Sequence, residues 1–523
     1  MNYQRALDAA VEAARLGGEI IRAEFERPGG PRGEPGACPA DVRAEQRIRH
    51  HLRTAFPDWQ FYGEETGSTG SPSAHHWLVD PNDGTWSFQR GARGSSVSIA
   101  LLFRDRLVLG VVLAPNPPIA GCEEDLIAWA EGTGPATRNG RPVRRVWADG
   151  LSAQQTVLLA VGADRWAEVH ARRVEPARFR AVNSVAYRMA LVAVGEGECG
   201  VTLAAATDYD FAAAHAILRG VGGDLVGADG RPIRYGLESG GVVDAGGRCF
   251  GGGVRSTLEL SRRDWVSTRG EAPVRGLCRP SPARIFTGDR RLLDRAQGLM
   301  LGLVASDSWC ATGMRDGDLL AGQPTARTEG ALLLARALLA EDGFVPNSLR
   351  DLYARWSEVS EAEEVGPLYR APPLALAASK GQADRWARED AALTHGAGPA
   401  PANAVWVSVL QDVVRTGEPA VGRRAERLFA WGRDLAELAE ASDVQAGVEA
   451  AYRLNGCRLA VLTGAVLGAR FGASRLPWRW VDRVLTCRPA RSSPRPRPPE
   501  VWPVDLLVVA EQLLHLAGRG SVS

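Results

Sequence analysis

A chain of 523 residues is long enough for about two to four domains. Its 45% hydrophobic and 24% charged residues exclude a long disordered chain, and a net charge of +1 gives no sign of a nucleic-acid or membrane-surface partner. The eight cysteines form no C-x-x-C pair, which excludes a zinc ribbon and argues against a disulfide-dense secreted scaffold. Without a signal peptide or an apolar run of roughly 18–20 residues, we expect a cytoplasmic protein.

Residues 1–258 alternate between helical and extended patterns, in this order along the chain. Apolar residues recur at helical spacing between Ala6 and Ile21, and a short apolar strand at 77–79 runs directly into Asp80. Further strand-like runs follow at 97–102, 107–113 and 156–161, and a helical pattern at 210–220 ends in glycines. This alternation predicts a layered α/β domain over residues 1–258.

The chain changes character after residue 258. Residues 259–290 are polar, contain several prolines and lack a clear period, which is typical of a linker. Beyond them the pattern is helical almost throughout, so we expect an all-α domain over 291–523. The helices are predicted at 292–304, 330–340, 404–414, 448–468 and 504–516, and the proline-rich stretch 488–499 is predicted to be a loop.

The first half carries a set of carboxylates around one glycine turn. Asp80 and Asp83 stand three residues apart at a strand end, with Pro81 and Asn82 between them and Gly84 after them. Such a turn can aim both carboxylates and the Asn82 carbonyl at one point, where a hard cation such as Mg²⁺ binds oxygen ligands. Gly84 would let the backbone and the following N–H groups approach a phosphate. The turn alone is equally compatible with an acidic surface loop.

A longer set of motifs is much more specific. The string W-x-V-D-P-x-D-G-T-x-x-F runs from Trp77 to Phe88, and Gly63-Glu64-Glu65 precedes it. Tyr209-Asp210-Phe211-Ala212-Ala213 and then Gly222-Gly223 follow in the second half of the same region. These motifs resemble the inositol monophosphatase family of Mg²⁺-dependent, lithium-sensitive phosphatases. The resemblance implies an αβαβα sugar-phosphatase fold over residues 1–258.

The resemblance also implies roles for individual residues. Glu65, Asp80 and the Asn82 carbonyl would hold a first Mg²⁺, and Asp80, Asp83 and Asp210 a second, while Asp41 stands where the family supports a third. Thr85, hydrogen-bonded near Glu65, would orient and deprotonate the attacking water, so the expected catalytic residues are Glu65, Asp80 and Thr85. Gly84, Thr85, Asp83 and Asp210 would contact the substrate. The expected substrate is a small phosphomonoester (an inositol phosphate, a sugar phosphate or a nucleotide-derived phosphate), and the expected assembly is a homodimer.

The helical half resembles the ADP-ribosylglycohydrolase family, whose all-α domain uses two Mg²⁺ ions. Its metal motifs align with Thr325-Ala326-Arg327-Thr328 and Asn455-Gly456-Cys457-Arg458, where the family's carboxylates are missing. Because Arg327 and Arg458 bring positive charge to positions that would need negative ligands, we expect this domain to be inactive. The alternative function is a regulatory protein whose degenerate domain binds ADP-ribose or a related nucleotide; a metal-independent glycohydrolase is the least favoured interpretation.

Overall fold

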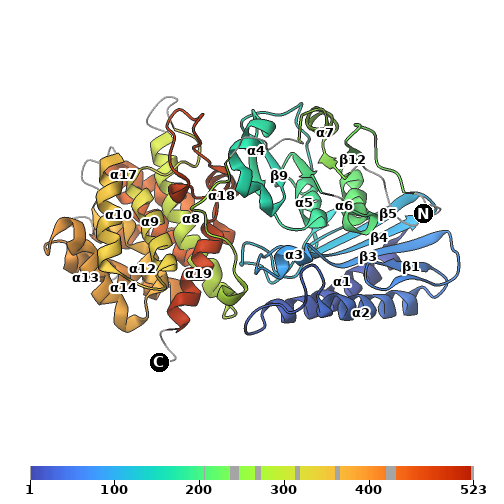
Figure 1. Cartoon of the computed structure of the whole chain (residues 1–523), viewed down its shortest axis with the longest axis horizontal. Helices are drawn as coiled ribbons and strands as arrows, with labels where there is room; N and C mark the ends of the chain where they lie inside the picture. The colour runs from blue at the N-terminus through green and yellow to red at the C-terminus, as the bar shows by residue number, and fades with distance from the viewer. Residues whose placement is uncertain are drawn as a thin grey trace. The chain divides into compact units, whose positions relative to one another are not determined.

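The computed structural model describes residues 2–204, 206–235, 247–265, 272–312, 319–359, 366–419 and 432–519. They divide into two units (Figure 1). Two clusters of buried apolar side chains lie in the first unit and one lies in the second. The first unit comprises 1–118, 123–274 and 281–283, and the second comprises 119–122, 275–280 and 284–523. Short segments from inside the first half, 119–122, and from the predicted linker therefore belong to the helical unit.

The first unit contains two sheets. The larger has the order β2-β1-β3-β4-β5-β6-β7-β8, with β1 parallel to β3 and the other neighbours antiparallel. Its strands are β1 (Gln60–Gly63), β2 (Gly67–Thr69), β3 (His75–Asp83), β4 (Ser96–Phe103), β5 (Arg106–Ala114), β6 (Asp125–Ala130), β7 (Thr137–Arg138) and β8 (Arg141–Pro142). The smaller has the order β10-β9-β11-β13-β12, built from β9 (Thr156–Leu159), β10 (Arg178–Ala181), β11 (Cys199–Thr202), β12 (Asp224–Gly227) and β13 (Cys249–Gly252).

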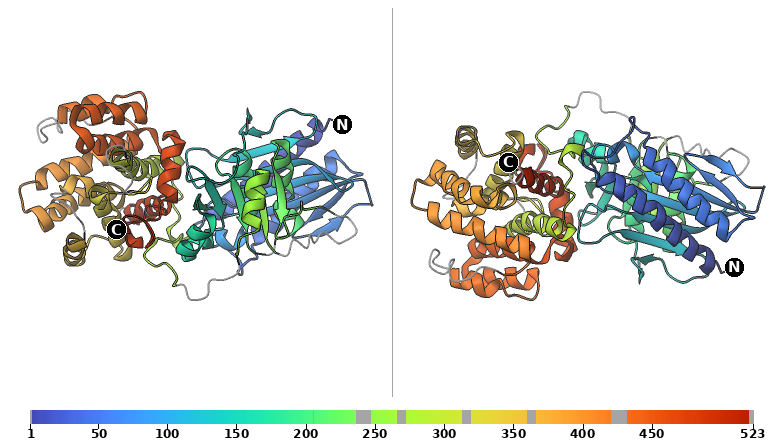
Figure 2. Two further views of the ribbon diagram at one scale, coloured as in Figure 1. Left: turned by 90° about the horizontal axis from the view of Figure 1, so that it is seen from above. Right: turned by 90° about the horizontal axis from the view of Figure 1, so that it is seen from below.

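Helices cover both faces of the larger sheet. The helices α1 (Gln4–Phe25) and α2 (Pro39–Ala55) lie side by side along one face, as Figure 2 shows from below. On the other face α5 (Val185–Ala193) and α6 (Asp208–Gly220) lie between the two sheets. The remaining helical elements of this unit are α3 (Thr85–Phe88), η1 (Val161–Trp166), α4 (Ala167–Val174) and α7 (Val254–Ser261), with α4 and α7 on the smaller sheet.

The central strands are apolar at consecutive positions because both faces of the sheet are covered. Val97, Ile99 and Leu101 of β4 belong to the core beneath α1 and α2, whereas Ala100 and Leu102 belong to the core that contains α5 and α6. A strand with one face in water would instead alternate apolar and polar residues. This double burial fixes the place of β3, whose carboxyl end carries the acidic turn.

The second unit is helical. Its elements are α8 (Arg290–Thr312), α9 (Ala326–Ala340), α10 (Pro346–Val359), α11 (Pro367–Arg370), α12 (Pro372–Ala377), α13 (Lys380–His395), α14 (Ala400–Thr416), α16 (Gly432–Leu438), α17 (Val444–Phe471), η4 (Ala473–Arg475), α18 (Trp478–Thr486), η5 (Pro499–Val501) and α19 (Leu506–Arg519). The short helix η3 (Pro282–Arg284) begins in residues assigned to the first unit and ends in the second. Across the described ranges, none of the helices combines the length and the apolar content that crossing a bilayer requires.

Glycines bring α8 and α17 into close contact. A Cβ added to Gly298 would lie 2.1 Å from the Gly468 carbonyl oxygen, and one added to Gly302 would lie 2.2 Å from that of Gly464. Both distances are impossible for real atoms, so this crossing requires residues without side chains. The glycines that recur through the helical half of the sequence therefore hold the centre of this unit together.

The mixed sheet-and-helix fold of the first half and the helical second half confirm the predicted fold classes, with two local differences. The helix predicted at 448–468 runs from Val444 to Phe471 but is interrupted at Asn455 and Gly456, where Gly456 adopts a φ of 58°. The predicted strand at 156–161 ends at Leu159 and passes into η1. Within the predicted linker, residues 266–271 lie outside the described part of the chain.

Candidate active site

An irregularity in β3 turns two aspartates toward one point. Asp80 pairs with Ser98 of β4 and Asp83 with Ser96, so the register shifts between them. In a regular strand, residues three apart point to opposite faces of the sheet. The bulge between Asp80 and Asp83 removes this restriction. Within the turn, the Asn82 backbone N–H donates a hydrogen bond to the Asp80 carboxylate at 2.8 Å. Asp80 and Asp83 can therefore face the same cavity.

Asp210 reaches the same place from the first turn of α6. Its carboxylate accepts the Thr207 N–H at 2.5 Å, which closes a capping box at the start of the helix. Oxygen atoms of Asp80, Asp83 and Asp210 all lie within 4.8 Å of one another. Residues more than a hundred positions apart in the chain thus form one cluster of carboxylates.

Of the two consecutive glutamates, Glu64 joins this cluster. Its carboxyl group is hydrogen-bonded to that of Asp80, and Glu64 lines the same cavity of about 590 Å³ as the three aspartates. Glu65, the glutamate that the motif predicts at this place, does not line the cavity. The turn is instead held by the buried carboxylate of Glu45 on α2, which accepts the backbone N–H groups of Glu65 and Thr66, each at 2.8 Å.

The Thr85 hydroxyl is hydrogen-bonded to Asp41, whereas the sequence motif predicted hydrogen bonding near Glu65. The Thr85 hydroxyl lies 2.9 Å from Asp41 Oδ2 and 2.9 Å from the Asn82 carbonyl oxygen. The other oxygen of Asp41 accepts the Asn82 side-chain amide at 3.0 Å. Asp41 is only 1% exposed, so its carboxylate is a fixed internal partner of Thr85.

Asp83 is held by the start of α5. One of its oxygens accepts the Ser184 hydroxyl at 2.5 Å and the Ala186 N–H at 2.6 Å. The Ser184 hydroxyl in turn caps the helix by accepting the Tyr187 N–H. Gly84, the next residue, has a φ of 95°, and a Cβ there would lie 2.7 Å from Asn183 Oδ1. Glycine is therefore required at position 84 both by its backbone conformation and by the space available.

Burial and mutual repulsion make this cluster hold protons. Burial raises the pKa of Glu64 and of Asp83 to about 7 and that of Asp210 to about 6, and neighbouring carboxylates add to each shift. The pKa of Asp80 is raised well above its ordinary value, by burial first and then by Glu64 and Asp83. The buried Arg188 guanidinium opposes the shift at Asp83. Carboxylates so arranged can be ionised together only if cations compensate their charge.

This donor set fits magnesium. The cluster offers hard oxygen ligands from several carboxylates, and the Asn82 carbonyl oxygen lies in the same turn. Among the described residues, Asp80, Asp83 and Asp210 are also the group of three candidate ligands close enough to share one ion.

Comparison with known proteins agrees with this chemistry. The sequence model of the inositol monophosphatase family matches residues 2–259. Inositol monophosphatase 3 of Solanum lycopersicum is 30% identical over 209 residues, which cover 39% of this chain and 73% of that protein. Inositol-1-monophosphatase of Rhizobium meliloti is 34% identical over 215 residues, covering 39% and 76% respectively. The chain belongs to the inositol monophosphatase family.

A solved family structure and the properties of the family complete the comparison. The inositol monophosphatase of Anabaena (Nostoc) sp. PCC 7120 aligns with 50% of this chain and 96% of its own, at 24% identity and a TM-score of 0.40. Inositol monophosphatases are magnesium-dependent and act on small phosphorylated substrates. The chain is accordingly a metal-dependent phosphomonoesterase.

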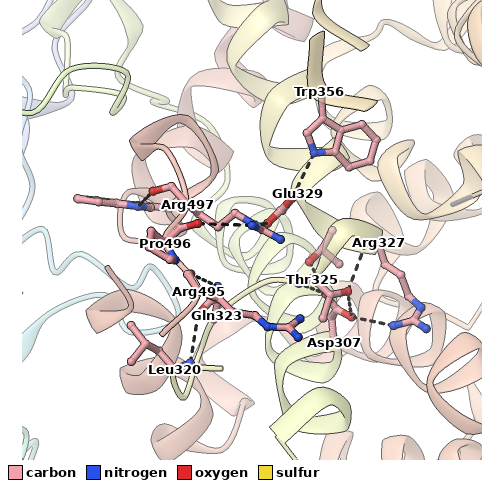
Figure 3. A network of polar contacts seen from close by, with 12 residues as sticks. Asp307, Leu320, Gln323, Thr325, Arg327, Glu329, Trp356, Arg495, Pro496 and Arg497 are labelled. Atoms are coloured by element: carbon pink, nitrogen blue, oxygen red, sulfur yellow. Dashed lines mark hydrogen bonds and ion pairs between the residues drawn. The ribbon is translucent and has the colours of Figure 1, made fainter. Parts of the chain in front are cut away.

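The polar cluster of the helical unit is organised differently (Figure 3). Asp307 of α8 is fully buried and accepts hydrogen bonds from the Thr325 N–H, the Thr325 hydroxyl and the Thr328 hydroxyl, at 2.7, 2.9 and 2.6 Å. Arg327 approaches the same carboxylate at 3.8 Å. Glu329 nearby accepts hydrogen bonds from Trp356 and Arg497. Protein donors thus already satisfy the buried Asp307 carboxylate beside residues 325–328, where the sequence predicts a metal motif without its carboxylates.

The sequence did not predict the roles of three residues of the active site. Glu64 belongs to the carboxylate cluster, Glu45 accepts the backbone N–H groups of the turn that follows Glu64, and Asp41 is the hydrogen-bond partner of Thr85. A signal for the last two exists. Asp41 and Glu45 are one helical turn apart on the face of α2 that also buries Ala44 and Ile48. Acidic residues on an apolar helix face require internal partners, which marks them as candidates for a polar site.

Proposed function

We propose that this chain hydrolyses a small phosphomonoester at the cavity lined by Asp80, Asp83 and Asp210. Glu64, Asp80, Asp83, Asp210 and the Asn82 carbonyl are the residues that would hold Mg²⁺, with two ions as the proposed number. The observation that carries the proposal is the convergence of carboxylates from β3, α6 and the turn after β1 on one cavity.

Thr85 and Asp41 are proposed to handle the proton of the attacking water. The Thr85 hydroxyl donates to Asp41, so its oxygen lone pairs remain able to accept a hydrogen bond from water. A proton taken from that water can pass to the Thr85 hydroxyl while the Thr85 proton passes to Asp41. This transfer is possible because hydrogen bonds to Asp41 and to the Asn82 carbonyl hold the Thr85 hydroxyl in place. Gly84 and Thr85 are proposed to contact the phosphate from the same turn.

Bound magnesium would supply Lewis acidity toward the phosphate oxygens and the leaving oxygen. The protein residues fix the geometry around it. Asp83 is held by α5 and Asp210 by its own capping box, so neither carboxylate has to move when substrate arrives.

For the helical unit we propose a scaffold role within a chain organised as 1–258, a linker at 259–290 and 291–523. The glycine-mediated crossing of α8 and α17 and the satisfied Asp307 support packing as its task. A relationship to the ADP-ribosylglycohydrolases remains part of this proposal, as does a homodimeric assembly.

The test is release of inorganic phosphate from a panel of phosphomonoesters by the purified full chain, with and without Mg²⁺. Release should require Mg²⁺ and should be lost in Asp80→Asn with the fold intact by circular dichroism. Asp229→Asn is the matched control, because Asp229 is an exposed aspartate of the same unit. Its partner within the described ranges is Arg231, through the side chain at 3.7 Å and the backbone N–H at 2.9 Å. Absence of phosphate release from the whole panel would refute the proposal.

A further inference from the structure

The cavity that holds the carboxylates has a second, apolar side. Among the described residues, five large hydrophobic side chains are exposed, and two of them, Trp86 (57% exposed) and Leu203 (36% exposed), line this cavity. Val161 of η1 and Val185 of α5 line it too. Exposed large apolar side chains that gather at one cavity point to a binding role, because a scattered distribution would be expected otherwise.

Contacts with Arg90 fix the orientation of the Trp86 side chain. The Arg90 guanidinium lies over its ring, 3.4 Å from the ring centroid, and Arg90 Nη1 donates to the Trp86 carbonyl oxygen at 2.8 Å. An indole stacked in this way keeps its orientation while more than half of its surface remains accessible. Trp86 directly follows Thr85, so a phosphate ester held at the carboxylate cluster brings its organic group next to this ring.

Two polar side chains on these walls already have protein partners. Thr202 accepts a hydrogen bond from the buried Arg188 at 2.8 Å, and the Asn183 amide is directed at the Gly84 carbonyl oxygen, 3.5 Å away. Bound polyols such as inositol or a sugar need a hydrogen-bond partner for each hydroxyl that leaves water. With Thr202 and Asn183 engaged in this way, Trp86 and Leu203 offer mainly apolar contact area to a bound ring.

From this arrangement we infer the class of substrate: a phosphomonoester whose organic group is an aromatic ring, packed on Trp86 and Leu203, with its phosphate at the carboxylate cluster. The inference rests on the proposed function and makes it more specific. Trp86 and Leu203 are then specificity residues of the site and take no part in the chemical step.

The experiment compares two primary alkyl phosphates, benzyl phosphate and glycerol 3-phosphate, with myo-inositol 1-phosphate as a third ester. The first two leave as primary alkoxides, so a difference between them reports mainly on binding of the organic group. With the full chain and saturating Mg²⁺, we expect kcat/KM for benzyl phosphate to exceed that for each polyol phosphate at least about tenfold, as burial of an aromatic ring predicts.

Substitutions of Trp86 and Leu203 test whether these two residues cause the preference for benzyl phosphate. Trp86→Ala and Leu203→Ala should each lower kcat/KM for benzyl phosphate about three- to tenfold and leave glycerol 3-phosphate unchanged, while Trp86→Phe should retain most of the preference. Val254→Ala removes an exposed side chain that does not line the cavity and should change neither substrate. A preference for the polyol phosphates, or an equal loss for both classes in Trp86→Ala, overturns the inference and leaves the phosphatase intact. Lack of hydrolysis of all three esters, with phosphate released from another member of the panel, overturns the inference alone. No release from any ester of the panel overturns the proposed function as well.

Discussion

The carboxylate of Asp41 accepts the hydroxyl of Thr85 at 2.9 Å, although the two residues are 44 positions apart and belong to α2 and α3. This bond connects a helix on the outer face of the larger sheet to the turn that carries Asp80 and Asp83. It gives the Thr85 hydroxyl a buried hydrogen-bond acceptor next to the carboxylate cluster, and it depends on both elements being in place.

Removing the Thr85 hydroxyl should therefore slow the chemical step. We expect Thr85→Val to lower kcat about 10²–10⁴-fold with a much smaller change in KM, because a proton pathway is lost while the carboxylates remain. Thr85→Ser keeps the hydroxyl and should retain most of the activity. Steady-state kinetics with Mg²⁺ in excess measure both, and equal activity of the valine and serine variants would contradict the role given to Thr85.

Substitution of Gly63 should disturb the turn that presents Glu64. A Cβ at position 63 would lie 2.3 Å from the buried carboxylate of Glu45, which accepts the N–H groups of the following residues. Gly63→Ala should lower the free energy of unfolding by about 1–3 kcal/mol and weaken Mg²⁺ binding. Chemical denaturation and calorimetry measure the two effects. Gly162→Ala is the control for stability, since a Cβ at Gly162 would meet open space.

Without divalent cations, the first unit should become less stable as the pH rises. The pKa values of Glu64 and Asp83 are raised to about 7 and that of Asp210 to about 6, so the folded state retains protons that the unfolded state has already lost. The stability from these groups is fully present below their unfolded pKa, near 4, and is lost as the pH passes through about 6 to 7. In EDTA, the Tm should fall between about pH 5 and pH 8.

Excess Mg²⁺ provides the control for this pH dependence. A bound cation replaces the protons, so the fall in Tm between pH 5 and pH 8 should be reduced or abolished. Asp210→Asn, which removes one of the titrating groups, should also weaken the fall in EDTA. A Tm in EDTA that increases over this range would show that the carboxylates do not repel one another as their positions imply.

The crossing of α8 and α17 should tolerate no side chain at its centre. Gly302→Ala would place a methyl group 2.2 Å from a backbone oxygen of Gly464, which neither helix can avoid without moving apart. We expect a loss of about 1–3 kcal/mol in the free energy of unfolding of the helical unit. Gly381→Ala on α13 meets open space and should be neutral or slightly stabilising. Equal stability of the two variants would exclude the close-packed crossing.

The sequence predicted the fold and the site best where a short stretch contains a complete apolar run or a complete set of carboxylates. The apolar runs of β4 and β5 predicted buried strands, and the spacing of Asp80 and Asp83 with the motif at Asp210 identified carboxylates that do meet. Local pattern could not decide between Glu64 and Glu65. They are adjacent and identical in type, and the direction of the turn is set by Glu45 on a distant helix.

Tertiary contacts also explain the other differences. The partner of Thr85 is fixed by the packing of α2 against the sheet, so Asp41 could be recognised only as an acidic residue on a buried helix face. The break in α17 follows from the positive φ of Gly456, whereas the helical period continues on both sides of it. Residues 119–122 belong to the helical unit, where the Ala120 N–H donates a hydrogen bond to Gln297, 177 residues away. The periodicity of the sequence does not predict a contact between residues so far apart.

Crystals of the full chain grown with Mn²⁺ in place of Mg²⁺ test the central claim most directly, because anomalous scattering locates the ion without reference to activity. We predict anomalous density in contact with carboxylate oxygens of Asp80, Asp83 and Asp210, and with Glu64 in preference to Glu65. Fully occupied Mn²⁺ bound only elsewhere on the protein, with these four side chains still directed at one another, would contradict the assignment of this cavity as the metal-dependent phosphatase site.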